Sequence, residues 1–249
     1  MSKKRRLKRV LPDGRTVIVP MDHGVSKPIE GLTEIERILR EIDGLADAVV
    51  LHKGIVKNVQ YVDEMSMGLI VHLSASTCLR EPNEKVLVTS VEKAIKLGAD
   101  MVSVHINIGS KTERSQLKDL GTISEVCDDW GMPLLAMVYA RGEGIYERDP
   151  ELVKHCVRVA YELGADIVKT NYTNNFAEIV EYAEIPVVIA GGSKKNELEL
   201  LKEVAKAIES GASGVAIGRN VFQHRNPKAI VKALKKIVHE NAKLEEVII

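Results

Sequence analysis

Short runs of apolar, mostly β-branched residues recur along the chain, and each run is followed by a longer amphipathic stretch rich in charge. Nearly continuous apolar runs with little polar alternation are typical of strands covered on both faces, as in parallel sheets. The runs lie at 16–21, 47–51, 68–73, 99–104, 133–138, 165–169, 186–190 and 213–217. We therefore expect eight strands joined by helical crossovers.

The stretches between these runs repeat apolar residues with helical spacing. Asp149 and Asn226 each stand directly before a proline, the pattern of an N-cap followed by the first helical residue. Gly98, Gly164 and Gly211 each follow a charged stretch, where a glycine can end a helix in the left-handed region. The expected helices are 33–43, 59–65, 90–97, 113–130, 150–163, 174–183, 195–209 and 227–241.

Chain length limits how these units can be arranged. Eight β/α units in 249 residues average about 31 residues each, which is close to the minimum for a closed barrel. No Pro-, Ser- or Gly-rich linker indicates a second domain. The prediction is an α/β protein with a single (β/α)8 TIM barrel over residues 16–249, preceded by a basic arm over residues 1–15; a doubly wound open sheet is the alternative.

Composition excludes several classes of partner. The 35 Lys and Arg residues balance the 35 Asp and Glu residues, so no overall field attracts the chain to nucleic acid or to an anionic membrane. No run approaches the length of a membrane helix. Three cysteines without a C-x-x-C pair fit a reducing cytosol, so we expect a cytoplasmic protein.

The basic arm carries six Lys or Arg residues in the seven positions 3–9. Arms that bind nucleic acid usually interleave such charges with aromatic residues, and this one does not. We expect an arm that is solvated, or that covers the bottom of the barrel or a neighbouring subunit. Neither a nucleic acid nor a membrane is predicted as a partner.

Catalytic groups of such barrels lie at the C-terminal ends of the strands. Lys169 ends the sixth predicted strand, where burial and nearby cations would lower its pKa and allow its amine to attack a carbonyl. The plainer alternative is a lysine that reaches solvent or pairs with an acid. Lys53, after the second strand, is a second candidate amine, and it could equally bind substrate oxygens.

Tyr139 ends the fifth predicted strand and Asp22 follows the first. The tyrosine could exchange a proton with a substrate oxygen, and the carboxylate could act as a base. Each could instead be structural, the tyrosine by packing and the aspartate by accepting loop amides. Lysine, tyrosine and aspartate from three strands together are suited to making or breaking a carbon–carbon bond beside a carbonyl.

Glycines follow the last two predicted strands. Gly191 and Gly192 come after the seventh, and Gly218 and Arg219 after the eighth. Many barrels bind phosphate at this place through loop amides and a helix N-terminus, and an arginine can add a bidentate contact. A phosphorylated small molecule is therefore the expected substrate, although such glycines can also simply form tight turns.

Histidines on or after the first four strands raise a competing interpretation. Together with Asp22, the residues His23, His52, His72 and His105 could supply ligands to a catalytic metal. No H-x-H pair or other close spacing supports such a site. We therefore predict no metal ion and keep a metal-dependent lyase or hydrolase as a less favoured class, with a non-catalytic phosphosugar-binding barrel as a further alternative.

Six segments resemble the archaeal-type class I aldolases of the DhnA group. They are residues 20–26, 51–56, 72–77, 137–142, 166–170 and 218–223. The similarity runs in the same order from about Arg9 to Glu246 without an insertion. It implies a lysine-dependent barrel enzyme that needs no metal or organic cofactor and that assembles into a homo-oligomeric ring of barrels.

The same resemblance assigns roles to residues. Lys169 would form the Schiff base, Tyr139 would donate a proton and Asp22 would accept one. The residues implied to line the substrate and its phosphate are His23, Gly24, Val25, Ser26, Ala140, Arg141, Gly191, Gly192, Gly218 and Arg219.

Within the group, two activities stay open. One is a transaldolase that moves a carbon fragment from 6-deoxy-5-ketofructose 1-phosphate to L-aspartate semialdehyde, in an archaeal route to 3-dehydroquinate and aromatic amino acids. The other is fructose 1,6-bisphosphate aldolase. Those aldolases tend to carry tryptophan two residues before the tyrosine, where this chain has Met137, which favours the transaldolase. Ala140 replaces a more common proline without loss of side-chain chemistry.

Overall fold

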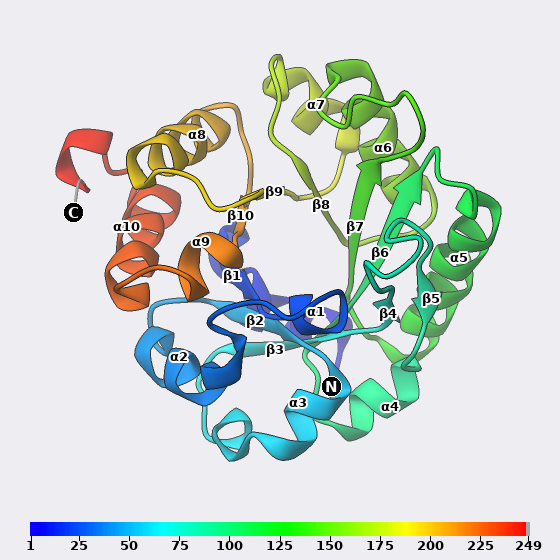
Figure 1. Cartoon of the computed structure of the whole chain (residues 1–249), viewed down its shortest axis with the longest axis horizontal. Helices are drawn as coiled ribbons and strands as arrows, with labels where there is room; N and C mark the ends of the chain where they lie inside the picture. The colour runs from blue at the N-terminus through cyan, green and yellow to red at the C-terminus, as the bar shows by residue number, and fades with distance from the viewer. Residues whose placement is uncertain (248–249) are drawn as a thin grey trace.

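The computed structural model describes residues 1–247, so residues 248–249 of the predicted barrel domain lie outside the described range. Eight parallel strands close into a barrel with helices around it (Figure 1), which confirms the predicted fold. In barrel order from the first strand they are β1 (Thr16–Pro20), β2 (Ala48–Leu51), β3 (Gly68–His72), β6 (Met101–Ile108), β7 (Leu134–Ala140), β8 (Ile167–Asn171), β9 (Val187–Ala190) and β10 (Gly214–Ala216).

The predicted helices appear in the predicted order, one of them displaced, and two further helices form where none was predicted, over residues 3–10 and 219–222. They are α1 (Lys3–Val10), α2 (Ile35–Ile42), α3 (Lys53–Asn58), α4 (Val91–Lys96), α5 (Glu113–Trp130), α6 (Pro150–Glu162), α7 (Phe176–Ala183), α8 (Glu197–Glu209), α9 (Arg219–Phe222) and α10 (Pro227–Glu240). The predicted helix 59–65 was wrong in its bounds: α3 begins directly after His52, and a 3₁₀ turn at Gln60–Asp63 follows it. The Asp149 and Asn226 side chains accept amides of the first turns, as N-caps do.

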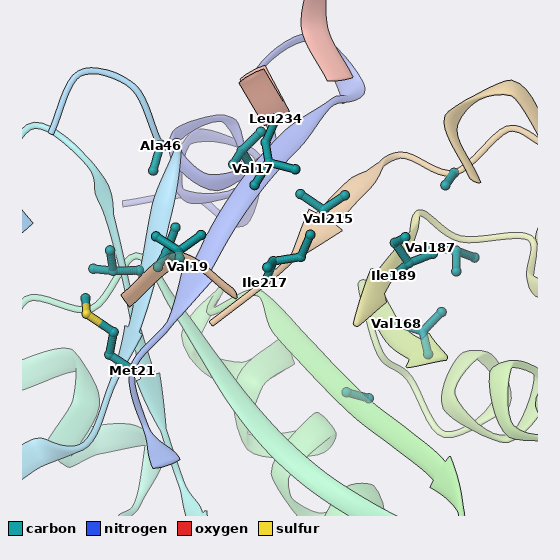
Figure 2. Close-up of a cluster of buried hydrophobic side chains, with 14 of the residues drawn as sticks. Val17, Val19, Met21, Ala46, Val168, Val187, Ile189, Val215, Ile217 and Leu234 are labelled. Carbon is teal, nitrogen blue, oxygen red and sulfur yellow. The ribbon is translucent and has the colours of Figure 1, made fainter. Parts of the chain in front are cut away.

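Alternate residues of each strand point to opposite sides of the barrel wall. One set is buried between strands and helices, as Figure 2 shows for Val17, Val215 and Ile189, with Leu234 of α10 nearby. The other set fills the barrel interior; Ile18 and Ile167 belong to it. Both faces are therefore buried, which explains the continuous apolar runs.

The basic N-terminal segment forms α1, which packs against the N-terminal ends of the strands. Val10 is fully buried and Leu11 nearly so, and both belong to the apolar cluster of the barrel interior. The Thr16 hydroxyl donates to the Val10 carbonyl at 2.5 Å. Helix α1 thus closes the bottom of the barrel with its apolar side.

A repeated arrangement of aspartates holds this bottom together. An aspartate directly before each of β2, β6 and β8 accepts the backbone amide of a residue on or next to the neighbouring strand and also pairs with a basic side chain. The sets are Asp47 with Val17 and His239, Asp100 with Leu69 and Arg9, and Asp166 with Leu134 and Lys3. Two of the three basic partners come from α1, so the charges of this helix balance acids of the barrel.

The barrel closes where its first strand meets its last. Thr16 pairs with Gly214 and Ile18 with Ala216. Gly214 has φ +148°, and a Cβ at this position would collide with the Thr16 backbone, so the close approach requires glycine. Helix α10 covers this junction, and Arg15 donates to the Val238 carbonyl at its end at 2.9 Å.

A small hairpin that the sequence did not predict follows β3 at the C-terminal end of the barrel. Its strands are β4 (Ser74–Ala75) and β5 (Val86–Leu87), which pair antiparallel. Among residues 1–247, no helix is both long enough and apolar enough to cross a membrane.

Candidate active site

A cavity of about 590 Å³ opens at the C-terminal ends of the strands. Every barrel strand contributes to its wall, at the last inward-facing position or in the loop that follows. The inward positions are apolar near the bottom, as at Ile167, and polar near the top, as at Lys169 and Asn171 on the same strand. The alternation that builds the core therefore also delivers polar groups to the cavity.

Lys169 lies inside the barrel on β8 with 7% of its surface exposed. Burial lowers its pKa; the Asp22 carboxylate acts in the opposite direction, and Arg141 and Arg219 lower the pKa further, to about 8. Its nearest polar partner is the Met137 sulfur, 3.9 Å from Nζ. The amine is therefore accessible in its neutral, nucleophilic form near physiological pH.

Asp22 lies directly after β1 and faces the same space. Burial raises its pKa, but in acid, where His23 and His72 are protonated, their charges and that of Lys169 outweigh burial and hold the pKa below its usual range. Its oxygens lie 3.5 Å from His23 Nδ1 and 3.8 Å from His72 Nε2. Asp22 is thus an ionised carboxylate opposite a lysine whose pKa is lowered to about 8.

Tyr139 ends the inward-facing set of β7 and is 5% exposed. Its ring centroid lies 5.0 Å from that of His105, and the Arg141 guanidinium lies over the ring at 4.5 Å. Burial, the largest influence, raises the pKa of the phenol, and the opposing charge of Arg141 does not cancel it. The tyrosine therefore holds its proton and can donate it.

The histidines of the wall are neutral and do not form a metal cage. Burial lowers the pKa of His23, of His52, of His105 and of His72, the last to about 4. His105 is hydrogen-bonded through its Nε2 to Asn107. Among residues 1–247, no three His, Cys, Asp or Glu side chains are placed to hold a metal ion.

The two glycine loops lie side by side, as their sequence positions predict. The Asn220 side chain joins them: its amide nitrogen donates to the carbonyls of Gly191 (3.1 Å) and Ser193 (3.2 Å). A Cβ on Gly191 would come within 2.8 Å of Ile217, and one on Gly218 would meet the Pro20 carbonyl. Glycine is required in both places because the loops are packed tightly against the barrel rim.

Arg219 begins α9 in this wall and lacks a compensating acid. Its buried Nε atom has no hydrogen-bond partner among the described residues. Burial is the main cause that lowers the pKa of its guanidinium, and the repulsion from Arg141 adds to it. We call Gly191, Gly192, Gly218 and Arg219 the glycine–arginine wall; its composition suits an anion.

The structure brings most predicted site residues to the cavity, but not all. Val25, Ser26 and Arg141 line it with the residues above. Gly24 is outside the wall, and Ala140 faces the helices because it follows Tyr139, the last inward-facing residue of β7. Lys53 is exposed on α3 and does not line the cavity, and its Nζ donates to the Val88 carbonyl.

Sequence reasoning missed polar residues carried by the β4–β5 hairpin. Ser76, Asn83 and Lys85 all line the cavity. Burial and the charge of Arg141 lower the pKa of Lys85 to about 8, against the opposing effect of Asp22. None of the eight predicted strands ends near Lys85 in the sequence, so the sequence offered no reason to place this residue in the site.

Known proteins share this arrangement over the whole chain. Residues 16–224 match the model of the DeoC/LacD family aldolases. The chain is 53% identical over 248 residues to 2-amino-3,7-dideoxy-D-threo-hept-6-ulosonate synthase 1 of Archaeoglobus fulgidus, covering 99% of this chain and 95% of the relative. It is 44% identical over 245 residues to 2-amino-4,5-dihydroxy-6-oxo-7-(phosphonooxy)heptanoate synthase of Streptomyces griseus, covering 95% and 89%.

A solved structure agrees with this relationship. An archaeal fructose-1,6-bisphosphate aldolase, with its catalytic lysine covalently bound to a carbinolamine intermediate, superposes with a TM-score of 0.86 at 34% identity. The match covers 95% of this chain and 99% of that one. The chain therefore belongs to the DeoC/LacD aldolase family, as a class I aldolase or transaldolase.

Proposed function

We propose that the protein is a lysine-dependent transaldolase that makes 2-amino-3,7-dideoxy-D-threo-hept-6-ulosonate from 6-deoxy-5-ketofructose 1-phosphate and L-aspartate semialdehyde. The observation that carries the chemistry is Lys169, a buried amine whose pKa is lowered to about 8 and whose Nζ forms no ion pair with a carboxylate of residues 1–247. The choice of substrates is supported by 53% and 44% identity to two seven-carbon amino-sugar-acid synthases, against 34% to the bisphosphate aldolase.

Schiff-base formation uses both proton-handling groups. The Lys169 amine attacks the ketone beside the donor's methyl group, and Asp22 takes a proton from the nitrogen and returns it to the former carbonyl oxygen. Tyr139 then protonates that oxygen, and water leaves. The products of this stage are an iminium on Lys169 and a tyrosinate, with the ionised Asp22 nearby to stabilise the positive charge.

Cleavage and addition use the same tyrosine in opposite directions. The tyrosinate removes the proton from the donor hydroxyl two carbons from the iminium carbon, the carbon–carbon bond breaks, and its electrons form an enamine. Hydroxypyruvaldehyde phosphate leaves. The enamine carbon then attacks the aldehyde of L-aspartate semialdehyde, Tyr139 protonates the new alkoxide, and water releases the product from Lys169.

Trapping the intermediate tests the chemistry. Borohydride added with the donor should reduce the iminium and fix on the enzyme either the whole donor or, where the enamine has been protonated back to an iminium, the retained three-carbon fragment. Peptide mapping should locate the adduct on Lys169. An adduct on Lys53 or Lys85, or complete loss of activity to a chelator without any adduct, would contradict the mechanism.

Substrate preference needs a separate measurement, because the glycine–arginine wall also suits the ketone-side phosphate of fructose 1,6-bisphosphate. The enzyme is given the deoxyketohexose phosphate with aspartate semialdehyde, and separately the bisphosphate. We expect the seven-carbon product to form faster than the bisphosphate is cleaved. Faster cleavage of the bisphosphate, without any seven-carbon product, would make fructose-bisphosphate aldolase the function.

A further inference from the structure

The cavity has a second positively charged wall opposite the glycine–arginine wall. In the closed order of eight strands, β6 stands four places from β10, on the far side of the barrel. His105 of β6, Arg141 after β7 and Lys85 of the hairpin line the cavity on this side. Arg141 and Lys85 both lie close enough to His105 for their positive charges to lower its pKa.

Lys85 is held in place without being neutralised. Its Nζ donates to the Ser76 hydroxyl at 2.6 Å, and within residues 1–247 no carboxylate forms an ion pair with it. The contact between Ser76 and Lys85 follows from the register of the hairpin. Ala75 pairs with Val86, so the next residue of each segment toward the loop comes close to the other. Val86 points outward with 59% exposure, so Lys85 next to it points toward the cavity.

Buried amides fix the hairpin on the barrel. The carbonyl of Asn83 accepts hydrogen bonds from the side-chain amides of Asn107 and Gln116, each at 2.9 Å. Both donors are fully buried. Lys85 lies two residues from this anchor, so its placement over the cavity is set before any ligand binds.

Arg141 leaves part of its guanidinium free on the same side. Its Nε donates to Glu147 at 2.7 Å, and its Nη1 lies 3.5 Å from His105 Nε2. Because the Asn107 amide nitrogen already donates to Asn83, the Asn107 oxygen must accept the Nε2 proton of His105. Two donors then face each other, so Nη1 has no acceptor in His105 and is free to bind a ligand oxygen.

We infer that Lys85 and Arg141 form the subsite for the carboxylate of the incoming aldehyde. The inference rests on the proposed function and identifies which side chains select an amino-acid aldehyde. Tyr139 handles the proton of the substrate hydroxyl, so the long arm of the substrate must pass over Tyr139. That ring contacts Arg141 and His105, so the arm ends at the second charged wall.

The leaving and arriving aldehydes place their anions at nearly the same point. The phosphorus of hydroxypyruvaldehyde phosphate is four bonds from its aldehyde carbon, and the carboxylate carbon of aspartate semialdehyde is three bonds from its own. A flexible lysine can adjust to a difference of about one bond. The subsite therefore releases a phosphate and then accepts a carboxylate as the two half-reactions alternate.

Acceptor selectivity in Lys85→Gln tests the inference. The ratio of kcat/KM for an anionic acceptor to that for a neutral one should fall about tenfold or more, since a charge-assisted contact is lost. The pairs are aspartate semialdehyde with propionaldehyde, and glyceraldehyde 3-phosphate with glyceraldehyde. The loss should be expressed mainly in KM, and Lys85→Arg should restore most of the ratio.

Lys194→Gln is the matched control, because Lys194 also lines the cavity but lies next to the glycine loop after β9 and donates to the Gln223 carbonyl. It removes the same charge from the other side and should change the ratio less than threefold. An equal fall of the ratio in both variants would mean that the overall positive charge of the cavity attracts the acceptor, and would contradict a subsite at Lys85. An unchanged ratio in Lys85→Gln would overturn the inference outright.

Failure of the proposed function would look different. An enzyme that never uses aspartate semialdehyde but cleaves fructose 1,6-bisphosphate would contradict the proposed synthase activity. The glyceraldehyde pair would still report whether Lys85 binds the anion of an acceptor. The two results are therefore independent.

Discussion

Lys3 and Lys169 lie at opposite ends of one barrel, and their surroundings move their pKa values in opposite directions. Burial lowers both pKa values. For Lys3, hydrogen bonds to Asp128 and Asp166 outweigh burial, and its pKa is raised. For Lys169, the single nearby carboxylate of Asp22 does not outweigh burial together with two arginines, and its pKa falls to about 8.

The two lysines show that a buried cation can stabilise the fold where an acid pairs with it, and can serve chemistry where the acids are too few to pair with it. At the bottom, Asp166 and Asp100 pair with Lys3 and Arg9, and Asp47 is hydrogen-bonded to His239, so each of these carboxylates has a partner within the protein and the contacts contribute to stability. At the top, cations outnumber acids in the cavity wall, so charge is unbalanced and is available to substrate. Changes at the top should therefore affect turnover, and changes at the bottom should affect folding.

The largest expected effect is on turnover at the top. Lys169→Met removes the only amine placed to form the Schiff base in the mechanism, so activity should fall by roughly 10⁴-fold or more. Borohydride should then trap no adduct. Because the variant also removes a poorly solvated cation, its midpoint in urea should not fall; substantial remaining turnover would contradict the assigned role.

The next effect is on the pH dependence of trapping. The folded-state pKa of Lys169 is about 8, and its protonated form is not nucleophilic. The rate of adduct formation should therefore rise about tenfold for each pH unit below 8 and level off above it. The rate can be measured from pH 6 to 9 by adding borohydride at timed points and counting the trapped adduct. A rate that does not change over that range would contradict a lowered pKa.

A substitution at the N-terminal end of the barrel should lower stability and leave activity unchanged. Asp166→Ala leaves the Leu134 amide without its acceptor, 2.8 Å away, and Lys3 without one of its partners. The free energy of unfolding should fall by about 1–3 kcal/mol, measured by urea denaturation. The kcat of the folded enzyme should stay within about twofold. A large loss of kcat at unchanged stability would break the separation between the two ends.

The smallest effect is expected at a more exposed pair of the same kind. Arg9 contacts Asp100 at 2.8 Å but is about half exposed. Solvent screens such a pair, so Arg9→Gln should lower the free energy of unfolding by only about 0–1 kcal/mol. Denaturation at low and high salt tests this, since the difference between variant and parent should shrink as salt is added.

The barrel could be predicted from sequence because its physical cause is local. Strands covered on both faces must be continuously apolar, and their helices must carry an apolar stripe, so Val187–Ala190 and Glu113–Trp130 are evident in the sequence. Lys169, Tyr139 and the glycine loops were found for a related reason. A polar residue at the end of a buried run has few places to go except the mouth of the barrel.

The rest depends on contacts between distant residues. Lys53 follows a strand just as Asp22 does, but it starts a helix whose first turn leaves it exposed, and no local pattern distinguishes the two cases. Lys85 reaches the cavity because Asn83, two residues before it, is anchored by Asn107 and Gln116. A two-strand hairpin of two residues each is too short to produce a recognisable alternation.

The junction between β1 and β10 has a consequence for how the protein is made. Thr16 must wait for Gly214, nearly two hundred residues later, before the barrel can close. During synthesis the chain therefore exposes an unpaired strand edge until its last strand emerges. Gly218 and Arg219 follow that strand directly, so the anion-binding loops are completed in the same event. A nascent chain that carries Lys169 therefore still lacks the folded surroundings that lower the pKa of its amine, so the nucleophile becomes active only when the barrel is complete.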